Sequence, residues 1–345
     1  MNNLYSNYKG KKVFITGITG FKGSWLALIL KQLGAEVYGL GLDQKDSDSI
    51  FYKAEINNIA KIFIEDLQNE LTECCKNSIL ESDYIFHLAA QPLVSEGYKN
   101  PLETFQTNLI GTVRLLELIK NTKKEIIFFN ITTDKVYKPS YSPHTETEEL
   151  FGKDPYSLSK SFSDMVTQMY KENILPQNVK VFIGRAGNVL GGGDRSKNRV
   201  FTDVFDYCFH GKPLVLRNPN SVRPYQFVLD CLMNYVLLAT TNQQGAYNIG
   251  PDLSQNVTTE ELVKSFEKVH GSICYETNGK SIGKEASFLG LNNKKILNLL
   301  KKSPLCKTID DVTRYTYIYE KESIKGNALK EANRQVKLAI KEYGE

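Results

Sequence analysis

The sequence has little of what metal, redox and membrane chemistry require. Its six cysteines form no C-x-x-C pair and follow no regular spacing, and its four histidines are scattered. This pattern indicates reduced thiols that pack in the interior of a cytosolic protein, and it predicts neither a metal site nor a cysteine nucleophile. No apolar run is long enough to span a bilayer, and the first residues lack the basic and apolar regions of a signal peptide. We therefore expect a cytoplasmic protein without a membrane partner.

The chain also lacks an excess of charge of either sign. Its 43 basic and 39 acidic residues leave a net charge of +4 and are spread along the whole sequence, so nothing favours nucleic acid as a partner. With 345 residues, of which 41% are hydrophobic and 24% charged, the chain suits one large or two interlocked globular domains. Its function must therefore be sought in motifs.

A strand, a glycine loop and a helix follow one another near the start of the chain. Residues 13–16 form a short apolar run, a G-x-x-G-x-x-G loop occupies 17–23, and a helical pattern continues to about Gly34. Small residues let backbone amides approach a pyrophosphate, which the positive end of the helix faces. In this setting the glycine pattern is strong evidence for a dinucleotide site. Its candidate cofactor-binding residues are Gly17, Thr19, Gly20, Phe21 and Gly23.

Two acidic residues follow the next predicted strands. Residues 36–43 end in Asp43, about where the ribose hydroxyls of a dinucleotide should lie, and no arginine nearby suits a 2′-phosphate. Asp43 therefore favours NAD over NADP. Asp66 follows a predicted third strand at 62–64 and is a candidate for the adenine, although a surface carboxylate is an equal alternative.

The stretch from Asn130 to Lys160 carries the candidate chemistry. The apolar run 126–129 predicts a buried parallel strand, which places the polar residues after it at the sheet edge where ligands bind. Tyr156 and Lys160 are spaced i, i+4, so a helix that begins after Pro155 presents both on one face. A free phenol has a pKa of about 10, and a neighbouring ammonium favours the phenolate and lowers that pKa. The pair therefore suits an alkoxide-forming base, although an isolated Y-x-x-x-K is more often a solvated helix face.

The glycine spacing together with Y-x-x-x-K resembles the extended short-chain dehydrogenase/reductase family of nucleotide-sugar enzymes. Ala89 and Ala90, in the exit loop of a fourth strand, resemble the loop by which the family approaches its cofactor. One departure is that many relatives carry the ribose-binding acid two residues earlier, where this chain has Gly41. The resemblance implies an α/β fold, with a Rossmann-like doubly wound parallel sheet and a smaller mixed α/β C-terminal domain that binds substrate.

The resemblance also implies how the chain is divided. Residues 1–187, which also receive about 224–250, should form the NAD-binding domain, and residues 188–345 should form an interleaved nucleotide-sugar domain. A homodimer through residues 101–120 and 156–172 is implied as well.

The triplet Thr133-Asp134-Lys135 narrows the resemblance to nucleotide-sugar 4,6-dehydratases. Epimerases of the family lack an acid-base pair here, and other dehydratases resemble T-D-E or T-S/T-E. A Ser/Thr-Asp-Lys triplet with a tyrosine two positions later, here Tyr137, is similar to the CDP-glucose 4,6-dehydratase group. Residues 21–26, 185–194 and 216–228 also resemble that group. UDP-N-acetylglucosamine 4,6-dehydratases carry Asp-Lys too, so this pair alone does not distinguish the two groups of dehydratases.

The resemblance assigns a role to each of five catalytic candidates. Tyr156, with Lys160 and NAD lowering its pKa, would take the proton of the C4 hydroxyl, and Thr133 would hydrogen-bond the same oxygen. An uncharged Lys135 would remove the C5 proton, and a protonated Asp134 would protonate the departing C6 hydroxyl. Both groups would then hold the protonation state opposite to their solution preference, which requires a dry site.

The second half of the chain should hold the diphosphate. Guanidinium forks suit phosphate oxygens, and an amide at a glycine-rich turn adds a donor; a solvated cationic rim is the alternative. The candidate substrate-binding residues are Asn188, Arg195, Arg199, Arg217 and Arg223.

Three other functions stay open at this point. A 4,6-dehydratase of another nucleotide sugar is the nearest. A 4-epimerase or reductase would need neither Asp134 nor Lys135. A non-catalytic NAD-binding protein is the alternative from another class, because a fold does not fix a function.

Overall fold

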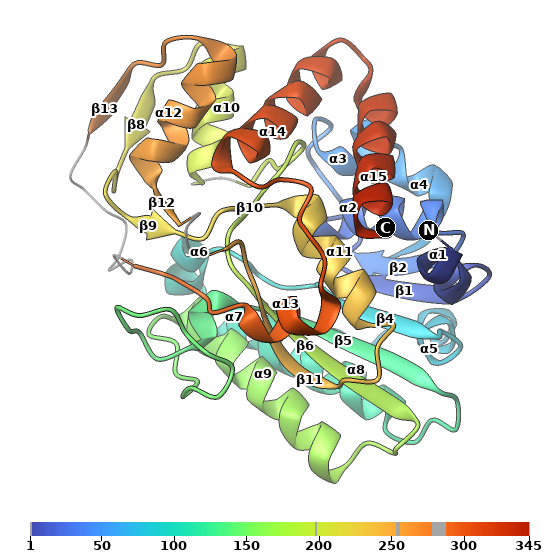
Figure 1. Cartoon of the computed structure of the whole chain (residues 1–345). Helices are drawn as coiled ribbons and strands as arrows, with labels where there is room; N and C mark the ends of the chain where they lie inside the picture. Colours follow the sequence, from blue (N-terminus) through green and yellow to red (C-terminus); the bar gives the residue numbers. More distant parts are fainter. Residues whose placement is uncertain (1, 197–198, 253–255, 278–287, 345) are drawn as a thin grey trace.

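A parallel sheet forms the centre of the computed structural model, which describes residues 2–196, 199–252, 256–277 and 288–344 (Figure 1). The strand order is β11-β6-β5-β4-β1-β2-β3, and every neighbouring pair is parallel. The order reverses between β1 and β4, and ligands bind at such a switch point in open α/β sheets. The strands are β1 (Lys12–Thr16), β2 (Glu36–Gly41), β3 (Ala60–Ile64), β4 (Tyr84–His87), β5 (Ile126–Thr133), β6 (Val179–Ala186) and β11 (Gly245–Ile249).

Alternating strand residues feed two cores, one on each face of the sheet. In β1, Val13 and Ile15 join a core with helices α2 (Phe21–Gln32), α11 (Val228–Leu238) and α15 (Ala328–Gly344). Phe14, between them, joins a core with α5 (Glu73–Leu80), α8 (Gly111–Ile119) and α9 (Pro155–Asn173) on the opposite face (Figure 1). Strands buried on both faces read as continuous apolar runs, as the sequence does here. The predicted doubly wound sheet is confirmed.

Two strands end elsewhere than the sequence predicts. β2 ends at Gly41 and not at Asp43, because its neighbour β3 ends at Ile64, which is the partner of Gly41. β5 continues beyond the apolar run to Thr133, because each of its residues up to Thr133 pairs with β6. Thr133 is thereby held in the sheet.

A smaller group of elements covers the carboxyl ends of the strands (Figure 1). Within it, β8 pairs with β13 in parallel and β9 pairs with β12 antiparallel, so this part is mixed α/β. The chain beyond residue 303 contains α14 and α15, and a capping box of Thr308 and Asp311 begins α14. The elements are α10 (Val200–His210), β8 (Leu214–Leu216), β9 (Val222–Arg223), β12 (Val257–Thr258), α12 (Thr259–His270), β13 (Tyr275–Thr277) and α14 (Ile309–Ile324).

Residues 101–119 form three consecutive helical parts. A π-helical turn, η1 (Gln106–Ile110), lies between α7 (Pro101–Phe105) and α8. Such turns often occur at functional sites. In η1 the buried side chain of Asn108 donates to Ser159 Oγ at 2.8 Å, which ties this region to α9.

The other elements are short, and no helix within the described ranges is both long and apolar enough to cross a membrane. They are α1 (Asn2–Tyr8), α3 (Ile50–Lys53), α4 (Ile56–Ile59), α6 (Val94–Lys99), η2 (Asp134–Val136), β7 (Val189–Leu190), β10 (Gln226–Phe227) and α13 (Lys294–Leu300).

Candidate active site

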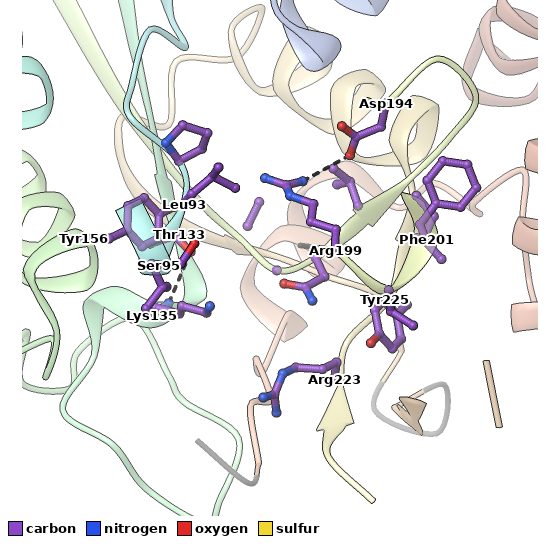
Figure 2. Close-up of a pocket in the computed structure, with 18 of the residues that line it drawn as sticks. Leu93, Ser95, Thr133, Lys135, Tyr156, Asp194, Arg199, Phe201, Arg223 and Tyr225 are labelled. Atoms are coloured by element: carbon purple, nitrogen blue, oxygen red, sulfur yellow. Dashed lines mark hydrogen bonds and ion pairs between the residues drawn. The ribbon is translucent and has the colours of Figure 1, made fainter. Parts of the chain in front are cut away.

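A cavity of about 300 Å³ lies at the carboxyl ends of β5 and β6 (Figure 2). At one end it is lined by side chains of the β5 loop and of α9, and across from them by residues of the segment 187–225. It therefore brings together the two halves of the chain that the sequence linked to chemistry. Of the candidate residues, Thr133, Lys135, Tyr156, Lys160, Ala90, Asn188, Arg199, Arg217 and Arg223 line it.

The start of α9 places the Tyr156–Lys160 pair. Asp154 caps this helix, because its Oδ1 accepts a hydrogen bond from Ser157 N at 2.9 Å. Pro155 occupies the first helical position, where a missing N–H costs nothing. Tyr156 thus stands in the first turn and Lys160 one turn later, as predicted.

The pKa values of this pair correct one expectation. Burial raises the pKa of Tyr156 to about 12, although a hydrogen bond with Thr133 lowers it in part. Burial, and then repulsion from Lys22, lower the pKa of Lys160 to about 7. Lys160 Nζ donates to the carbonyl of Ile131 at 2.7 Å. The predicted lowering of the Tyr156 pKa is therefore wrong for the chain by itself, because burial outweighs the hydrogen bond with Thr133 and the charge of Arg199.

The neighbouring acid and base differ in their surroundings. Asp134 is 2% exposed and accepts a hydrogen bond from Thr133 Oγ1 at 2.9 Å. Its other oxygen, Oδ2, is buried and has no hydrogen-bond partner in the described part of the chain. Burial raises the pKa of Asp134 more than the charge of Lys135 lowers it. The protonated carboxylic acid that the dehydration role requires is thus favoured, while Lys135 faces the cavity beside Thr133.

A buried hydrogen-bond network holds the segment next to Asp134 and Lys135. Tyr137 donates to Asn248 Oδ1 at 2.5 Å and accepts from Arg185 at 2.9 Å. Arg185, in turn, holds Asp164 through two bonds of 2.8 and 2.9 Å. These contacts connect η2 to β11, β6 and α9, and satisfied networks of this kind rigidify a core. In the sequence, Tyr137 is only part of the motif that resembles the CDP-glucose 4,6-dehydratase group. Its hydrogen-bond partners Arg185 and Asn248 are too distant in sequence to be predicted.

The glycine loop has the shape that a pyrophosphate needs. Gly17 has φ +73°, and a Cβ there would lie 2.8 Å from Ala89 N. A Cβ on Gly23 would lie 2.1 Å from the Gly17 carbonyl oxygen. Gly20 caps α2 without a side chain, which leaves the amides of the first turn to an anion. The residues present therefore fit a dinucleotide.

The two acids after β2 and β3 lie on the surface near these strand ends. Asp43 is ion-paired with Lys45, and its side chain is 56% exposed. Asp66 Oδ1 accepts from the backbone N–H of Gln68 at 2.9 Å, which forms a local turn. Their contacts with ribose and adenine stay predictions.

Three of the four candidate arginines line the cavity. Arg223 is 6% exposed and donates to the carbonyl of Val222 at 2.9 Å. Arg217 lies 3.7 Å from Asp203, and Arg199 donates to Asp194 at 3.2 Å. Arg199 and Arg223 reach the cavity from different segments (Figure 2).

Arg195 has a different position from the one expected. Its guanidinium donates to both carboxylate oxygens of Glu320, at 2.9 and 2.8 Å, and lies 4.0 Å from the ring centroid of Phe205. It does not line the cavity as the structure describes it. Since two of its nitrogens are held by Glu320 outside the cavity lining, the expected contact of Arg195 with the substrate does not fit this position.

Lys22 is a cavity residue that the sequence did not single out. Its ammonium donates to Tyr235 Oη at 3.3 Å, and burial lowers its pKa. The signal was its position inside the glycine loop, directly before Gly23. Ser95, Phe201 and Asp203 were missed as well, and no local pattern marks them.

Known proteins resemble this chain over most of its length. A family model described as GDP-mannose 4,6 dehydratase matches residues 14–297. A CDP-glucose 4,6-dehydratase of Salmonella typhimurium is 36% identical over 305 residues, which is 84% of each chain. A UDP-glucose 4-epimerase of Mycoplasma genitalium is 26% identical over 66% of this chain and 71% of its own.

Solved structures share the fold. A UDP-glucuronic acid 4-epimerase from Bacillus cereus, solved in complex with UDP-glucuronic acid and NAD, superposes with a TM-score of 0.78 at 24% identity. The match covers 90% of this chain and 99% of the other. An NAD-dependent NDP-hexosamine 5,6-dehydratase gives 0.76 at 19% identity and covers 93% and 99%. At such identities the likeness speaks for the fold alone.

Proposed function

Because the chain belongs to the GDP-mannose 4,6-dehydratase family, we propose that it is an NAD-dependent nucleotide-sugar 4,6-dehydratase, and that its substrate is CDP-D-glucose. The product is then CDP-4-dehydro-6-deoxy-D-glucose. One observation carries the proposal: Thr133, Lys135 and Tyr156 line a single cavity, and the buried Asp134 stands directly beside them. An epimerase has no use for this acid and this amine.

The glycine loop and Lys160 would hold NAD, which accepts a hydride from C4 and returns it to C6. Tyr156 takes the proton of the C4 hydroxyl, and Thr133 hydrogen-bonds the same oxygen. The C4 ketone acidifies the C5 hydrogen, which an unprotonated Lys135 removes. Asp134 gives its proton to the C6 hydroxyl, so that one water leaves and a C5–C6 double bond forms. As the hydride returns to C6, the protonated Lys135 gives its proton back to C5, which completes the 4-dehydro-6-deoxy sugar.

The residues that line the cavity indicate how the substrate is oriented along it. The reacting groups at the Tyr156 end define the place of the sugar, and Arg199 and Arg223 come next along the cavity (Figure 2). Phe201 and Tyr225 lie at the far end, where an aromatic base can stack. Sugar, diphosphate and nucleobase are expected in this order.

A panel of nucleotide sugars tests the proposal. The protein is incubated with CDP-glucose, UDP-glucose, GDP-mannose and UDP-N-acetylglucosamine, and products are analysed by mass and by base-induced absorbance. Loss of one water from CDP-glucose supports the proposal. Loss of water from UDP-N-acetylglucosamine alone favours the other dehydratase, an epimerised product favours the epimerase, and no reaction with any sugar favours a non-catalytic protein.

Truncation of Arg223 tests the diphosphate site. We expect Arg223→Met to raise KM by about 10- to 100-fold with little change in kcat, because charge-assisted contacts to the diphosphate hold substrate and transition state alike. Steady-state kinetics on CDP-glucose measure both parameters. Arg334→Met is the matched control, since Arg334 pairs with Glu331 on α15. Loss of turnover at unchanged affinity contradicts the assignment.

The proposal includes the organisation of the protein. Residues 1–187, with about 224–250, bind the cofactor, residues 188–345 bind the nucleotide sugar, and the protein works in the cytoplasm. It pairs with a second copy through 101–120 and 156–172. Support comes from apolar side chains that are 37 to 71% exposed on α7, η1 and α9, namely Leu102, Ile110, Phe162, Met165 and Met169.

A charge on this face tests the dimer. Phe162, Met165 and Met169 are spaced three and four apart, so they share one side of α9. We expect Met165→Asp to give a monomer, because an interface of this kind excludes an unpaired charge. Sedimentation velocity measures the mass, and Lys138→Asp is the control, because Lys138 is exposed and lies outside residues 101–120 and 156–172. A wild-type monomer, or a Met165→Asp dimer, contradicts the prediction.

A further inference from the structure

Helix α14 reaches the loop that borders the substrate side of the cavity. Glu320 on α14 is 1% exposed, and its Oε1 accepts from the backbone N–H of Gly193 at 2.8 Å. The same carboxylate receives the fork of Arg195 at 2.9 and 2.8 Å. A carboxylate that accepts three such bonds fixes the loop strongly, because charge-assisted hydrogen bonds are about twice as strong as neutral ones.

The loop at residues 192–193 also accepts hydrogen bonds from α2 and α3. Trp25 Nε1, on α2, donates to the Gly192 carbonyl at 3.1 Å, and Ile50 N donates to the Gly193 carbonyl at 3.3 Å. Gly193 has φ +80°, and a Cβ on Gly192 would lie 1.8 Å from the Tyr319 ring. Glu320 and its neighbour Tyr319 therefore restrict the conformation of the backbone at residues 192–193.

The next residue of the loop, Asp194, forms an ion pair with Arg199, and this ion pair faces the cavity. Asp194 is 2% exposed; its Oδ1 accepts from Ser196 N at 2.9 Å, and its Oδ2 accepts from Arg199 at 3.2 Å. Arg199 lines the cavity and precedes α10, which supplies Phe201 to the same wall (Figure 2). The contacts thus run without a break from Glu320, through the loop and Asp194, to Arg199.

We propose that Glu320 is a positioning residue that sets Arg199 for the diphosphate of the substrate. This inference rests on the proposed function and deepens it, since it gives the C-terminal helices a part in substrate binding. A displacement of about 1 Å in a binding group is enough to lower affinity or rate strongly. Glu320 does not line the described cavity, and we assign its effect to the contacts that run through Gly193 and Asp194 to Arg199.

The test measures binding of CDP to the full-length protein by titration calorimetry. Glu320→Gln keeps the shape of the side chain but loses its charge, and we expect the Kd for CDP to rise about tenfold. KM for CDP-glucose should rise in parallel while kcat stays within about twofold, because Thr133, Lys135 and Tyr156 are untouched. Glu331→Gln is the control, since Glu331 is also buried, at 7% exposed, but pairs with Arg334, away from the loop.

A double-mutant cycle separates positioning from general destabilisation. In an Arg199→Met background, Glu320→Gln should weaken CDP binding no further. An unchanged Kd in Glu320→Gln, or an equal loss in both backgrounds, overturns the inference. If Glu320→Gln does not fold, Arg195→Lys serves instead: it keeps the charge but loses the fork, and must also weaken CDP binding through Arg199. If the wild type makes no dehydrated product, the proposed function fails separately.

Discussion

Tyr156→Phe is expected to stop the first hydride transfer, with a loss of about 10²- to 10⁴-fold in the single-turnover rate, as for removal of a general base. The C4 hydroxyl cannot release its proton without an acceptor, and the proposal gives this role to Tyr156, which lines the cavity and is hydrogen-bonded to Thr133. Rapid mixing of the NAD-loaded protein with CDP-glucose, followed by the absorbance of the reduced cofactor, measures this step. A single-turnover rate equal to that of the wild type refutes the assignment.

The matched control is Tyr170→Phe on the same helix. The Tyr170 hydroxyl donates to Glu117 at 2.7 Å and does not line the described cavity, so its removal should leave the rate unchanged. The pH dependence gives a second readout. Since the reactive form of Tyr156 is deprotonated and burial raises its pKa to about 12, the wild-type rate should rise with pH. Tyr156→Phe has no hydroxyl to titrate and should lose this rise.

The sequence predicted those parts of the site that local patterns determine. The apolar run before Asn130, the glycine loop and the capped start of α9 each depend on residues close in sequence. These local patterns are sufficient to predict Thr133, Tyr156 and Lys160 at the ligand-binding edge of the sheet. Periodicity and helix-start signals are sufficient for such elements.

Other features depend on long-range packing and could not be predicted. Arg195 has the right chemistry for a phosphate, but its partner Glu320 is 125 residues away and no pattern joins the two. The pKa of Tyr156 depends on how completely the fold buries the phenol, which a spacing of four residues does not determine. In both cases the residue type was read correctly and its surroundings were unknown.

The second large effect is expected at the acid-base pair Asp134 and Lys135. Without Lys135, oxidation of the sugar should still occur but elimination of water should not. We expect Lys135→Met to lower product formation by about 10²- to 10⁴-fold, while the reduced cofactor still forms on addition of CDP-glucose, because Tyr156 and Thr133 remain. Lys138→Met is the control: Lys138 is 57% exposed and pairs with Glu149 on the surface. Full turnover in Lys135→Met shows that Lys135 is not the base.

Asp134→Asn should fail one step later than Lys135→Met, and isotope exchange distinguishes the two. With Lys135 present, the C5 hydrogen of the oxidised sugar should exchange with deuterated solvent although water is not lost, whereas Lys135→Met should show no exchange. In the wild type, the acid must be protonated to act, and burial raises its pKa, so elimination should slow as pH rises through that pKa. Mass spectrometry of the recovered sugar measures the exchange. Normal dehydration by Asp134→Asn, or exchange in Lys135→Met at the wild-type rate, would mean that this buried carboxyl and its neighbouring amine do not divide the two proton transfers.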